Sequence, residues 1–425
     1  MKLSLSIVTL AASGLLLLAN PVQADTVDPS EVVGTYADIA QAGYQDALFT
    51  ARDLRLAIQT LIKEPGEQSL ANARAAWKSA RIPYLQTEVY RFGNAIVDEW
   101  EGKVNAWPLD EGLIDYVDSS YGVNSDTNDL YTANVIANTS LTINGQAIDA
   151  TTISPDLLST HLHEAGGIES NVATGYHAIE FLLWGQDLNG SDAGAGTRPA
   201  SDYDVNNCTN GHCERRAQYL SAVTDLLVTD LEYIASAWAS GGEARTALTS
   251  ADNIIGLSAM LTGMGSLSYG ELAGERMQLG LMLHDPDREH DCFSDNTSAS
   301  HFYNGLGIQN VYNGDYKRVD GSIVSGPSLN DLLASTDKAL AMELGKNLQT
   351  SVHALLVLSG SQDNGEAYDQ LIAEGNTAGN QMVHNAIDAL VSQTRSLERA
   401  VVALGVSGIE FNGSDSLDDP SSVFQ

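Results

Sequence analysis

Two residues with metal-ligand chemistry, His177 and Glu180, are separated by three positions in the segment Gly175-Tyr176-His177-Ala178-Ile179-Glu180. On a helix, this spacing places both side chains on one face, with Cβ atoms about 5–6 Å apart. An imidazole nitrogen and a carboxylate oxygen can then reach one divalent ion, and zinc and iron accept this mixed set. Two ligands hold a metal weakly, so others must come from elsewhere. The alternative is a His–Glu hydrogen bond on an ordinary helix.

Other catalytic patterns are missing from the sequence. His161-Leu162-His163-Glu164 repeats the His-x-x-Glu spacing, but it lies in a polar run ended by Gly166-Gly167, so we rank it below the first pair. A His-Glu-x-x-His motif, which carries the usual zinc protease site, does not occur. A phosphate-binding loop, a dinucleotide-binding fingerprint and a Gly-x-Ser-x-Gly elbow are also missing.

Two acidic segments offer further ligand types. Residues 284–291, His-Asp-Pro-Asp-Arg-Glu-His-Asp, form either a second metal site or a solvated loop. Residues 187–192 begin like a calcium-binding loop, but Arg198 stands at the twelfth position, where such a loop needs Glu. An EF-hand type of loop is therefore not supported.

The three cysteines are too few for a disulfide-rich scaffold. Cys208 and Cys213 flank Thr-Asn-Gly-His, and in an exported protein this spacing favours a small disulfide loop that turns at Asn-Gly. A zinc site with the same two thiolates is the alternative. Cys292 would then be left without a disulfide partner.

The chain has 425 residues with 55 acidic and 21 basic side chains, a formal net charge of −34. Its length fits two or three domains, or one two-lobed unit. The acidity argues against nucleic acid as a partner and disfavours an anionic membrane surface, since both need clustered basic residues. Cations are the partners that such a field attracts.

Residues 1–24 are expected to be a secretory signal peptide. Lys2 precedes an apolar run over residues 7–19 that is too short to span a bilayer, and Val22 and Ala24 suit a cleavage site. A single anchoring helix is the alternative. We therefore expect an exported protein of the periplasm or cell surface, soluble after cleavage near Asp25.

Apolar residues spaced by three and four predict long amphipathic helices over residues 33–61, 329–355 and 383–404. Residues 67–92 and 213–239 also have a helical pattern. Pro83 should bend or break the first of these near Arg81. Ser328, with Asp331 three residues on, should cap one helix, and Gly405 should end another.

The predicted fold class is all-α, with two antiparallel helical bundles in one two-lobed unit. Residues 142–148 and 319–324 are expected to add small β-hairpins. The Gly-, Ser- and Asp-rich stretch 189–202 lies between helical blocks and suggests a lobe boundary. We therefore predict an N-terminal lobe at 25–200, which carries the His177 motif, and a C-terminal lobe at 201–425.

The segment Gly175–Glu180, followed by Phe181-Leu182-Leu183-Trp184-Gly185, resembles the Gly-x-His-x-x-Glu signature of the imelysin family. Other stretches resemble further blocks of that family and span nearly the whole mature chain. Within the family the chain looks most similar to the iron-regulated, imelysin-like envelope proteins. The stretches are Trp77 with Arg81–Tyr84, Glu88–Phe92, Asn105–Glu111, Gly274–Met277 and Glu289–Thr297.

This resemblance implies two related helical bundles with the signature near their interface, export, and a link to iron uptake. It implies one iron or zinc ion at the His177 site and suggests a membrane iron-transport component as a partner. The founding member was described as a metallopeptidase, so peptidase activity at the same site is the alternative function. A metal-free scaffold that docks to a membrane partner is a third possibility.

The resemblance also suggests the remaining ligands. Glu88 matches a glutamate of the first block and Asp110 lies in the second, and carboxylates suit iron. Either could instead be an ordinary surface acid. Arg276 is expected to balance charge, to hold an anionic substrate group, or to pair with a neighbouring acid. Nearby carboxylates are expected to raise the pKa of His177, so that protons and metal compete near neutral pH.

Overall fold

The computed structural model describes residues 27–249 and 252–424, and the predicted signal peptide at 1–24 lies outside these ranges. Within them the chain is mainly helical, with two short antiparallel hairpins. The predicted all-α fold with hairpin decorations is therefore confirmed. No helix in these ranges is long and apolar enough to cross a membrane.

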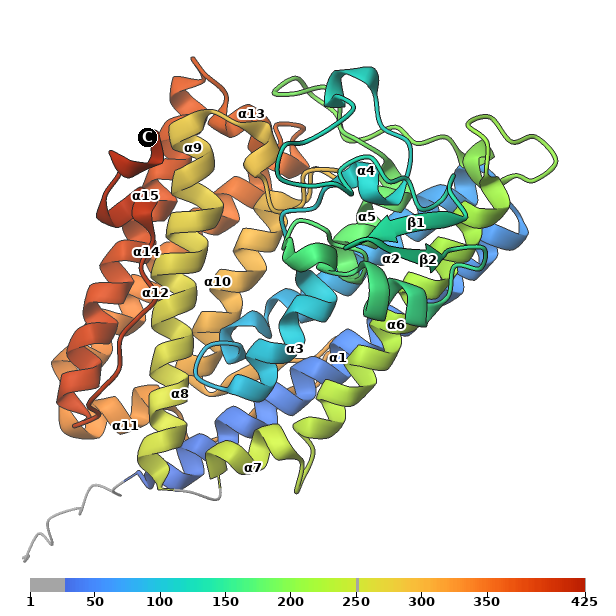
Figure 1. The fold of residues 1–425 in the computed structure, drawn as a ribbon. Helices are drawn as coiled ribbons and strands as arrows, with labels where there is room; N and C mark the ends of the chain where they lie inside the picture. Colours follow the sequence, from blue (N-terminus) through green and yellow to red (C-terminus); the bar gives the residue numbers. More distant parts are fainter. Residues whose placement is uncertain (1–26, 250–251, 425) are drawn as a thin grey trace, which may run out of the picture.

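The first group of helices is built around α1 (Pro29–Lys63), which packs along α2 (Glu67–Leu85) and α6 (Cys213–Ala237). The shorter helices α3 (Ala95–Asn105) and α5 (Gly175–Trp184) pack on α6 as well as on each other (Figure 1). The apolar stripe predicted for α1 is buried as expected, which explains why this helix forms. Its members are Val33, Tyr36, Ala40, Tyr44, Ala47, Ala51, Leu54, Ile58 and Leu61.

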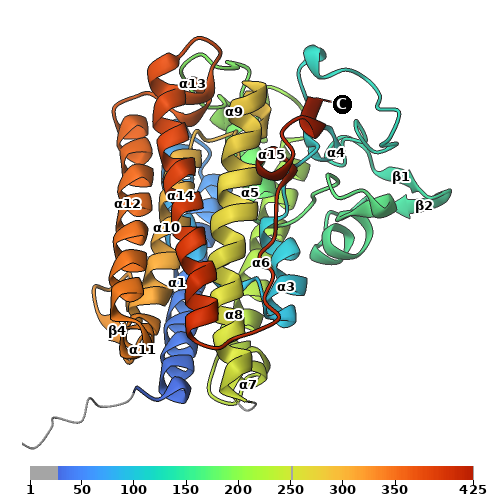
Figure 2. The ribbon, with the colours of Figure 1, turned by 90° about the vertical axis from the view of Figure 1, so that its left-hand side faces the viewer.

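The second group of helices contains one long continuous run. α8 (Asn253–Ser266) passes through the π-helix η6 (Leu267–Gln278) into α9 (Leu279–Leu283). Beside this run lie α10 (Thr297–Asn313), α12 (Lys338–Asp363) and α14 (Thr377–Ala403), as Figure 2 shows.

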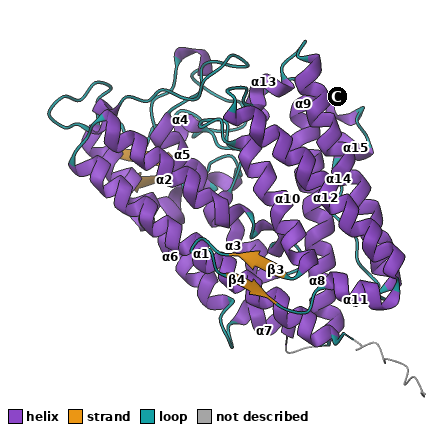
Figure 3. Ribbon diagram, turned by 180° about the vertical axis from the view of Figure 1, so that it is seen from behind, coloured by secondary structure: helices purple, strands orange, loops and turns teal. Residues whose placement is uncertain are grey.

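The two groups share a core. α10 packs against both α2 and α12, and α8 packs against α1, so one large cluster of buried apolar side chains extends across both groups. A smaller cluster lies between η6, α12, α14 and the short α13 (Tyr368–Ile372). α6, which follows residue 200 in the chain, packs with the first group. The view from behind in Figure 3 shows the two groups meeting along α10 and α2.

Shorter elements connect these helices. The first hairpin pairs β1 (Ser140–Ile143) with β2 (Gln146–Asp149), and the second pairs β3 (Asp315–Lys317) with β4 (Ile323–Ser325). The remaining elements are η1 (Glu88–Tyr90), α4 (Glu111–Ile114), η2 (Ser119–Tyr121), η3 (Leu157–Leu162), η4 (Ala165–Gly167), η5 (Ala200–Tyr203), α7 (Glu243–Thr249), η7 (Pro286–Arg288), α11 (Leu329–Thr336), α15 (Asp415–Asp418) and η8 (Ser422–Phe424).

Three predicted elements differ in detail. The helix predicted over 329–355 is two helices, because Asp337 has extended backbone and its side chain caps α12 by accepting from the Leu340 N–H. The second hairpin begins earlier than predicted, and Val319 lies in its turn, where the Val319 N–H donates to Asp46. α2 continues through Pro83 and ends at Leu85. Ser328 and Asp331 form the expected capping box.

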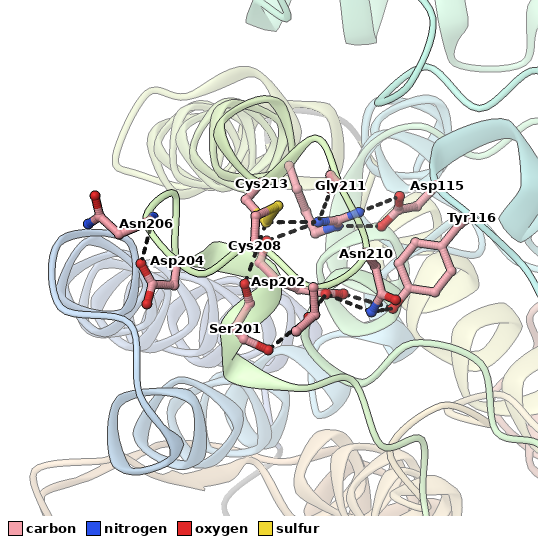
Figure 4. Close-up of a disulfide and its surroundings, with 12 residues drawn as sticks. Asp115, Tyr116, Ser201, Asp202, Asp204, Asn206, Cys208, Asn210, Gly211 and Cys213 are labelled. Carbon is pink, nitrogen blue, oxygen red and sulfur yellow. Dashed lines mark hydrogen bonds and ion pairs between the residues drawn. A yellow bond between two sulfur atoms is a disulfide. The ribbon is translucent and has the colours of Figure 1, made fainter.

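Cys208 and Cys213 are joined by a disulfide at the start of α6, and Cys292 has no disulfide partner. Figure 4 shows the disulfide beside Asp202 and Asp115. Both carboxylates accept from buried arginines, since Arg198 donates to each of them and Arg216 donates to Asp115. These buried ion pairs connect the loops that follow α4 and α5 to α6.

Candidate metal centre

Helix α5 begins at Gly175, where two features require a residue without a side chain. The backbone φ is +81°, in the left-handed region. A Cβ atom there would clash with the Val104 carbonyl oxygen in the last turn of α3. The adjacent Thr174 hydroxyl donates to the Lys103 carbonyl oxygen at 2.9 Å. Gly175 therefore fixes how closely α5 approaches α3, and so where its side chains lie.

His177 and Glu180 share one face of α5, as their spacing predicts, and both are completely buried. Nδ1 of His177 lies 3.0 Å from Oε2 of Glu180. Oε1 of Glu180 accepts from the backbone N–H and the hydroxyl of Ser294, at 3.0 and 2.7 Å. Nε2 of His177 is buried without a hydrogen-bond partner in the described part of the chain. This nitrogen is therefore available to a ligand.

The loop between η7 and α10 brings a second histidine and an aspartate to the same place. His177, His290 and Asp291 each offer a ligand atom, and these atoms lie within 4.8 Å of one another. Nδ1 of each histidine lies 3.7 Å from Oδ1 of Asp291. All three side chains are buried. Asn296 and Ser300 donate to the other oxygen of Asp291 and fix its orientation.

Arg81 of α2 provides the positive charge in this cluster. Its Nη2 lies 2.9 Å from Oδ1 of Asp291 and 3.3 Å from Nδ1 of His290. Its Nη1 donates to Oδ1 of Asn105 at 2.6 Å, and the side chain is fully buried. A cation that enters the cluster would compete with this guanidinium for Asp291.

Burial has the largest effect on protonation in the cluster. It lowers the pKa of His177 to about 3, helped by Arg81 and only partly opposed by Asp291. Burial, followed by the charge of Asp291, raises the pKa of Glu180 well above its usual value. Burial also acts to raise the pKa of Asp291, but Arg81 and His177 outweigh it, so this pKa is lowered. Asp291 therefore acts on the pKa of His177 in the expected direction, but burial and Arg81 outweigh it, and the expected net rise is wrong.

The donor set fits iron or zinc. Two neutral imidazoles and one ionised carboxylate are ligands that both ions take in proteins. Glu180 would either add an oxygen ligand or orient His177 through its Nδ1 atom, as carboxylates beside ligating histidines do. Nδ1 of His177 faces both Glu180 and Asp291 while Nε2 has no partner, so either nitrogen could serve as the ligand atom.

Glu88 and Arg276 lie in a neighbouring network. Oε2 of Glu88 accepts from Nη1 of Arg276 at 2.6 Å, and its Oε1 accepts from Asn105 at 2.8 Å. Arg276 also pairs with Glu271 at 2.7 Å. Asn105 bonds Arg81 as well, so Glu88 reaches the cluster only through two intervening residues. Arg276 balances the charge of two acids.

The structure does not bring Asp110 into the cluster. Its Oδ2 accepts from the side chains of Asn128 and Ser170, at 2.6 and 2.8 Å. In the His-x-x-Glu motif that we ranked second, His161 and Glu164 are both exposed, and the intervening His163 lies beside Thr174. Among the described residues, the His177 cluster is the one group of three or more ligand-type side chains close enough to share an ion.

A cavity of about 460 Å³ leads to the cluster between the two groups of helices. His290, Asn105 and Trp107 line it together with Arg276. Five glutamates and three arginines, Arg91, Arg276 and Arg288, also line the cavity, so its walls carry an excess of acid, which favours cations. The glutamates are Glu101, Glu164, Glu169, Glu271 and Glu275.

Sequence reasoning did not select His290, Asp291 or Arg81 as site residues. All three lie in stretches that resemble family blocks, and His290 and Asp291 end the segment that was considered for a separate metal site. For His290 and Asp291, the signal that could have identified them is that they belong both to a block that resembles the family and to this acidic segment. Spacing alone could not, because the residues come from α2 and from a loop far along the chain.

Comparison with known proteins supports the resemblance found in the sequence. Residues 40–397 match the family model described as Imelysin. Iron-regulated protein A of Synechococcus elongatus is 23% identical over 385 residues, which cover 88% of this chain and 85% of that protein. A crystal structure from Parabacteroides distasonis, provisionally named an iron-regulated protein A precursor, shares the fold. Its TM-score is 0.64 at 18% identity, over 88% of this chain and 95% of that chain.

Proposed function

This chain belongs to the imelysin family. From that premise we propose that it binds one metal ion at His177, His290 and Asp291, and that it prefers iron to zinc. The observation that carries the proposal is the convergence of these three ligand-type side chains within 4.8 Å. Glu180 assists as a fourth ligand or as the partner of His177. We propose further that the protein is exported and serves iron uptake, with a membrane iron-transport component as its partner.

Iron is preferred over zinc for two reasons. Two histidines and one carboxylate form the donor set of many non-haem iron(II) sites. The similar protein of Synechococcus elongatus is named for its regulation by iron. The charge of −34 and the acidic walls of the cavity would concentrate cations near the entrance.

Titration with iron(II) and with zinc tests the proposal. His177→Ala and His290→Ala should each weaken binding more than about a hundredfold, because the loss of outer-shell partners alone costs about 10–100-fold. His161→Ala is the matched control, since this exposed histidine repeats the His-x-x-Glu spacing away from the cluster. Equal affinities in all four proteins would show that the cluster does not bind the ion.

Metallopeptidase activity is the second candidate function. Three protein ligands leave a position for water in catalytic zinc sites, and such a water can attack a peptide carbonyl. Against this, His177, Glu180 and Asp291 are completely buried, so a polypeptide cannot reach them in this conformation. Metal-loaded protein should therefore fail to cleave an unfolded substrate. Chelator-sensitive cleavage that His177→Ala abolishes would favour the peptidase instead.

A further inference from the structure

One side chain in contact with the His177 cluster carries a permanent positive charge. The guanidinium of Arg81 is completely buried, and arginine stays protonated in proteins. Its Nη2 lies 2.9 Å from Oδ1 of Asp291, which is the one carboxylate among the three proposed ligands. Any cation that Asp291 binds would therefore lie close to a fixed positive charge that repels it.

Aromatic rings and a hydrogen bond hold Arg81 in this position. Its Cζ lies 5.1 Å from the ring centroid of Tyr176 and 5.6 Å from the centroids of Trp77 and Tyr84. All three rings are buried. Nη1 of Arg81 donates to Asn105 at 2.6 Å. Because aromatic faces attract cations, these rings stabilise the guanidinium beside Asp291 and oppose its movement away from an entering ion.

Among the described residues, the network next to the cluster is close to electrically neutral. Arg276 pairs with Glu88 and with Glu271, at 2.6 and 2.7 Å. Arg91 lies 3.7 Å from Glu271 and 3.7 Å from Glu101. Burial raises the pKa of Glu101 and so favours its neutral form. Two ionised acids then balance two arginines, and this network adds little negative charge to offset that of Arg81.

The charge of an ion therefore affects how well the cluster can hold it. The charges of Arg81 and Asp291 cancel, and Glu180 adds one negative charge if it ionises. A divalent ion then leaves one excess positive charge inside the protein, whereas a trivalent ion leaves two. Uncompensated buried charge is costly, so the cluster should disfavour the trivalent ion. The donor set acts in the same direction, since two histidines with one carboxylate are typical of iron(II) sites.

We propose that Arg81 makes the cluster selective for divalent over trivalent ions, so that the chain takes iron(II) and not iron(III). This inference rests on the proposed function, because it concerns the ion that the same site binds. Arg81 is not itself a ligand. It determines specificity through its fixed charge beside Asp291, and the aromatic rings around it keep that charge in place.

Titration of the full protein with zinc and with gallium(III), offered as its citrate complex, tests the proposal. Gallium(III) is redox-inert and has the charge of iron(III). Wild type should bind zinc more tightly than gallium(III) once competition by citrate is taken into account. A neighbouring charge changes the affinity for a proton by about 10- to 1000-fold. Because gallium(III) carries one more unit of charge than zinc, Arg81→Gln should shift the ratio of the two affinities toward gallium(III) by about tenfold or more. Any change in the proton affinity of Asp291 acts on both ions alike and cancels in this ratio.

Two control variants separate the charge of Arg81 from its packing. Arg81→Lys loses the forked guanidinium but keeps a positive charge, and it should retain the ratio of wild type. Arg52→Gln makes the same change of charge at an exposed position on α1 and should also retain it.

Circular dichroism shows whether each variant folds. The proposal is overturned if folded Arg81→Gln has the affinity ratio of wild type. If that variant does not fold, wild type decides alone, and gallium(III) bound as tightly as zinc overturns the proposal. Zinc binding that His177→Ala leaves unchanged would instead refute the proposed function, and this inference with it.

Discussion

Glu180 and His177 lie in contact on α5, yet burial changes their charge states in the same direction, toward neutrality. It lowers the pKa of His177 to about 3 and raises that of Glu180 well above its usual value. Near neutral pH the imidazole is therefore free of its extra proton, whereas burial favours the protonated form of the carboxyl group. The proton that competes with a metal ion is therefore on Glu180, and not on His177 as the sequence suggested.

Metal binding near pH 7 should release about one proton per ion, since a bound cation favours the ionised form of Glu180. Apparent affinity should fall as the pH drops, because more of the carboxyl group is then protonated. Calorimetry in buffers with different heats of ionisation measures this release. Glu180→Gln should abolish it, and Glu164→Gln, which changes an exposed acid, should not. Undiminished release from Glu180→Gln would assign the proton to another group.

At the scale of single residues, sequence reasoning succeeded where the interaction was local. Three-residue spacing on one helix predicted the contact between His177 and Glu180. The choice of Glu88 as a ligand depended on matching a block, and in the structure its carboxylate is paired with Arg276. Neither this ion pair nor the approach of Asp291 to His177 follows from spacing, because both depend on how separate helices pack.

At the scale of elements, the glycine of the signature acts through packing. Gly175→Ala would place a Cβ against the Val104 carbonyl at a left-handed φ. We expect it to lower the free energy of unfolding by about 3 kcal/mol, from the backbone conformation and the overpacking together. It should also weaken metal binding, since α5 carries His177. Urea unfolding and metal titration measure the two effects.

Gly190→Ala is the matched control for that substitution. Gly190 also has a positive φ, of +63°, but a Cβ there would meet no atom within 4 Å. Gly190→Ala should then lower the free energy of unfolding only by the cost of the left-handed backbone, about 1–2 kcal/mol. If the two variants lose the same stability, the contact between α5 and α3 is not what requires glycine at position 175.

The long helices were the most predictable elements. Apolar residues at helical spacing located α1, α6 and α14 closely, because burial of one face is what stabilises such helices. The same pattern continued through Asp337, where the chain in fact starts a new helix. There the Asp337 side chain accepts a hydrogen bond from the Leu340 N–H and so caps the start of α12. The apolar pattern does not detect such a local hydrogen bond.

At the scale of the whole molecule, an excess of buried acid determines the response to pH. Acids with raised pKa values include Glu111, Asp369, Asp295 and Asp230, and burial is the main cause for each. In the unfolded chain such groups ionise near pH 4. Between that pH and neutrality the folded state therefore holds more protons than the unfolded state, and stability rises as the pH falls.

Buried histidines oppose this trend below about pH 6.5, where they become charged only in the unfolded chain. Burial lowers the pKa of His177, His290, His301 and His163. The acids with raised pKa values outnumber these four, since they also include Glu101, Glu180, Asp187, Asp287 and Glu289. The acids should therefore determine the direction of the change.

Chelator-treated protein should accordingly unfold at a higher temperature at about pH 5 than at about pH 8. Loss of negative charge also relieves the self-repulsion of a chain with a net charge of −34, which acts in the same direction. Thermal unfolding followed by circular dichroism across this range measures the change. An unfolding temperature that falls steadily from pH 8 to pH 5 would mean that the buried histidines outweigh the acids.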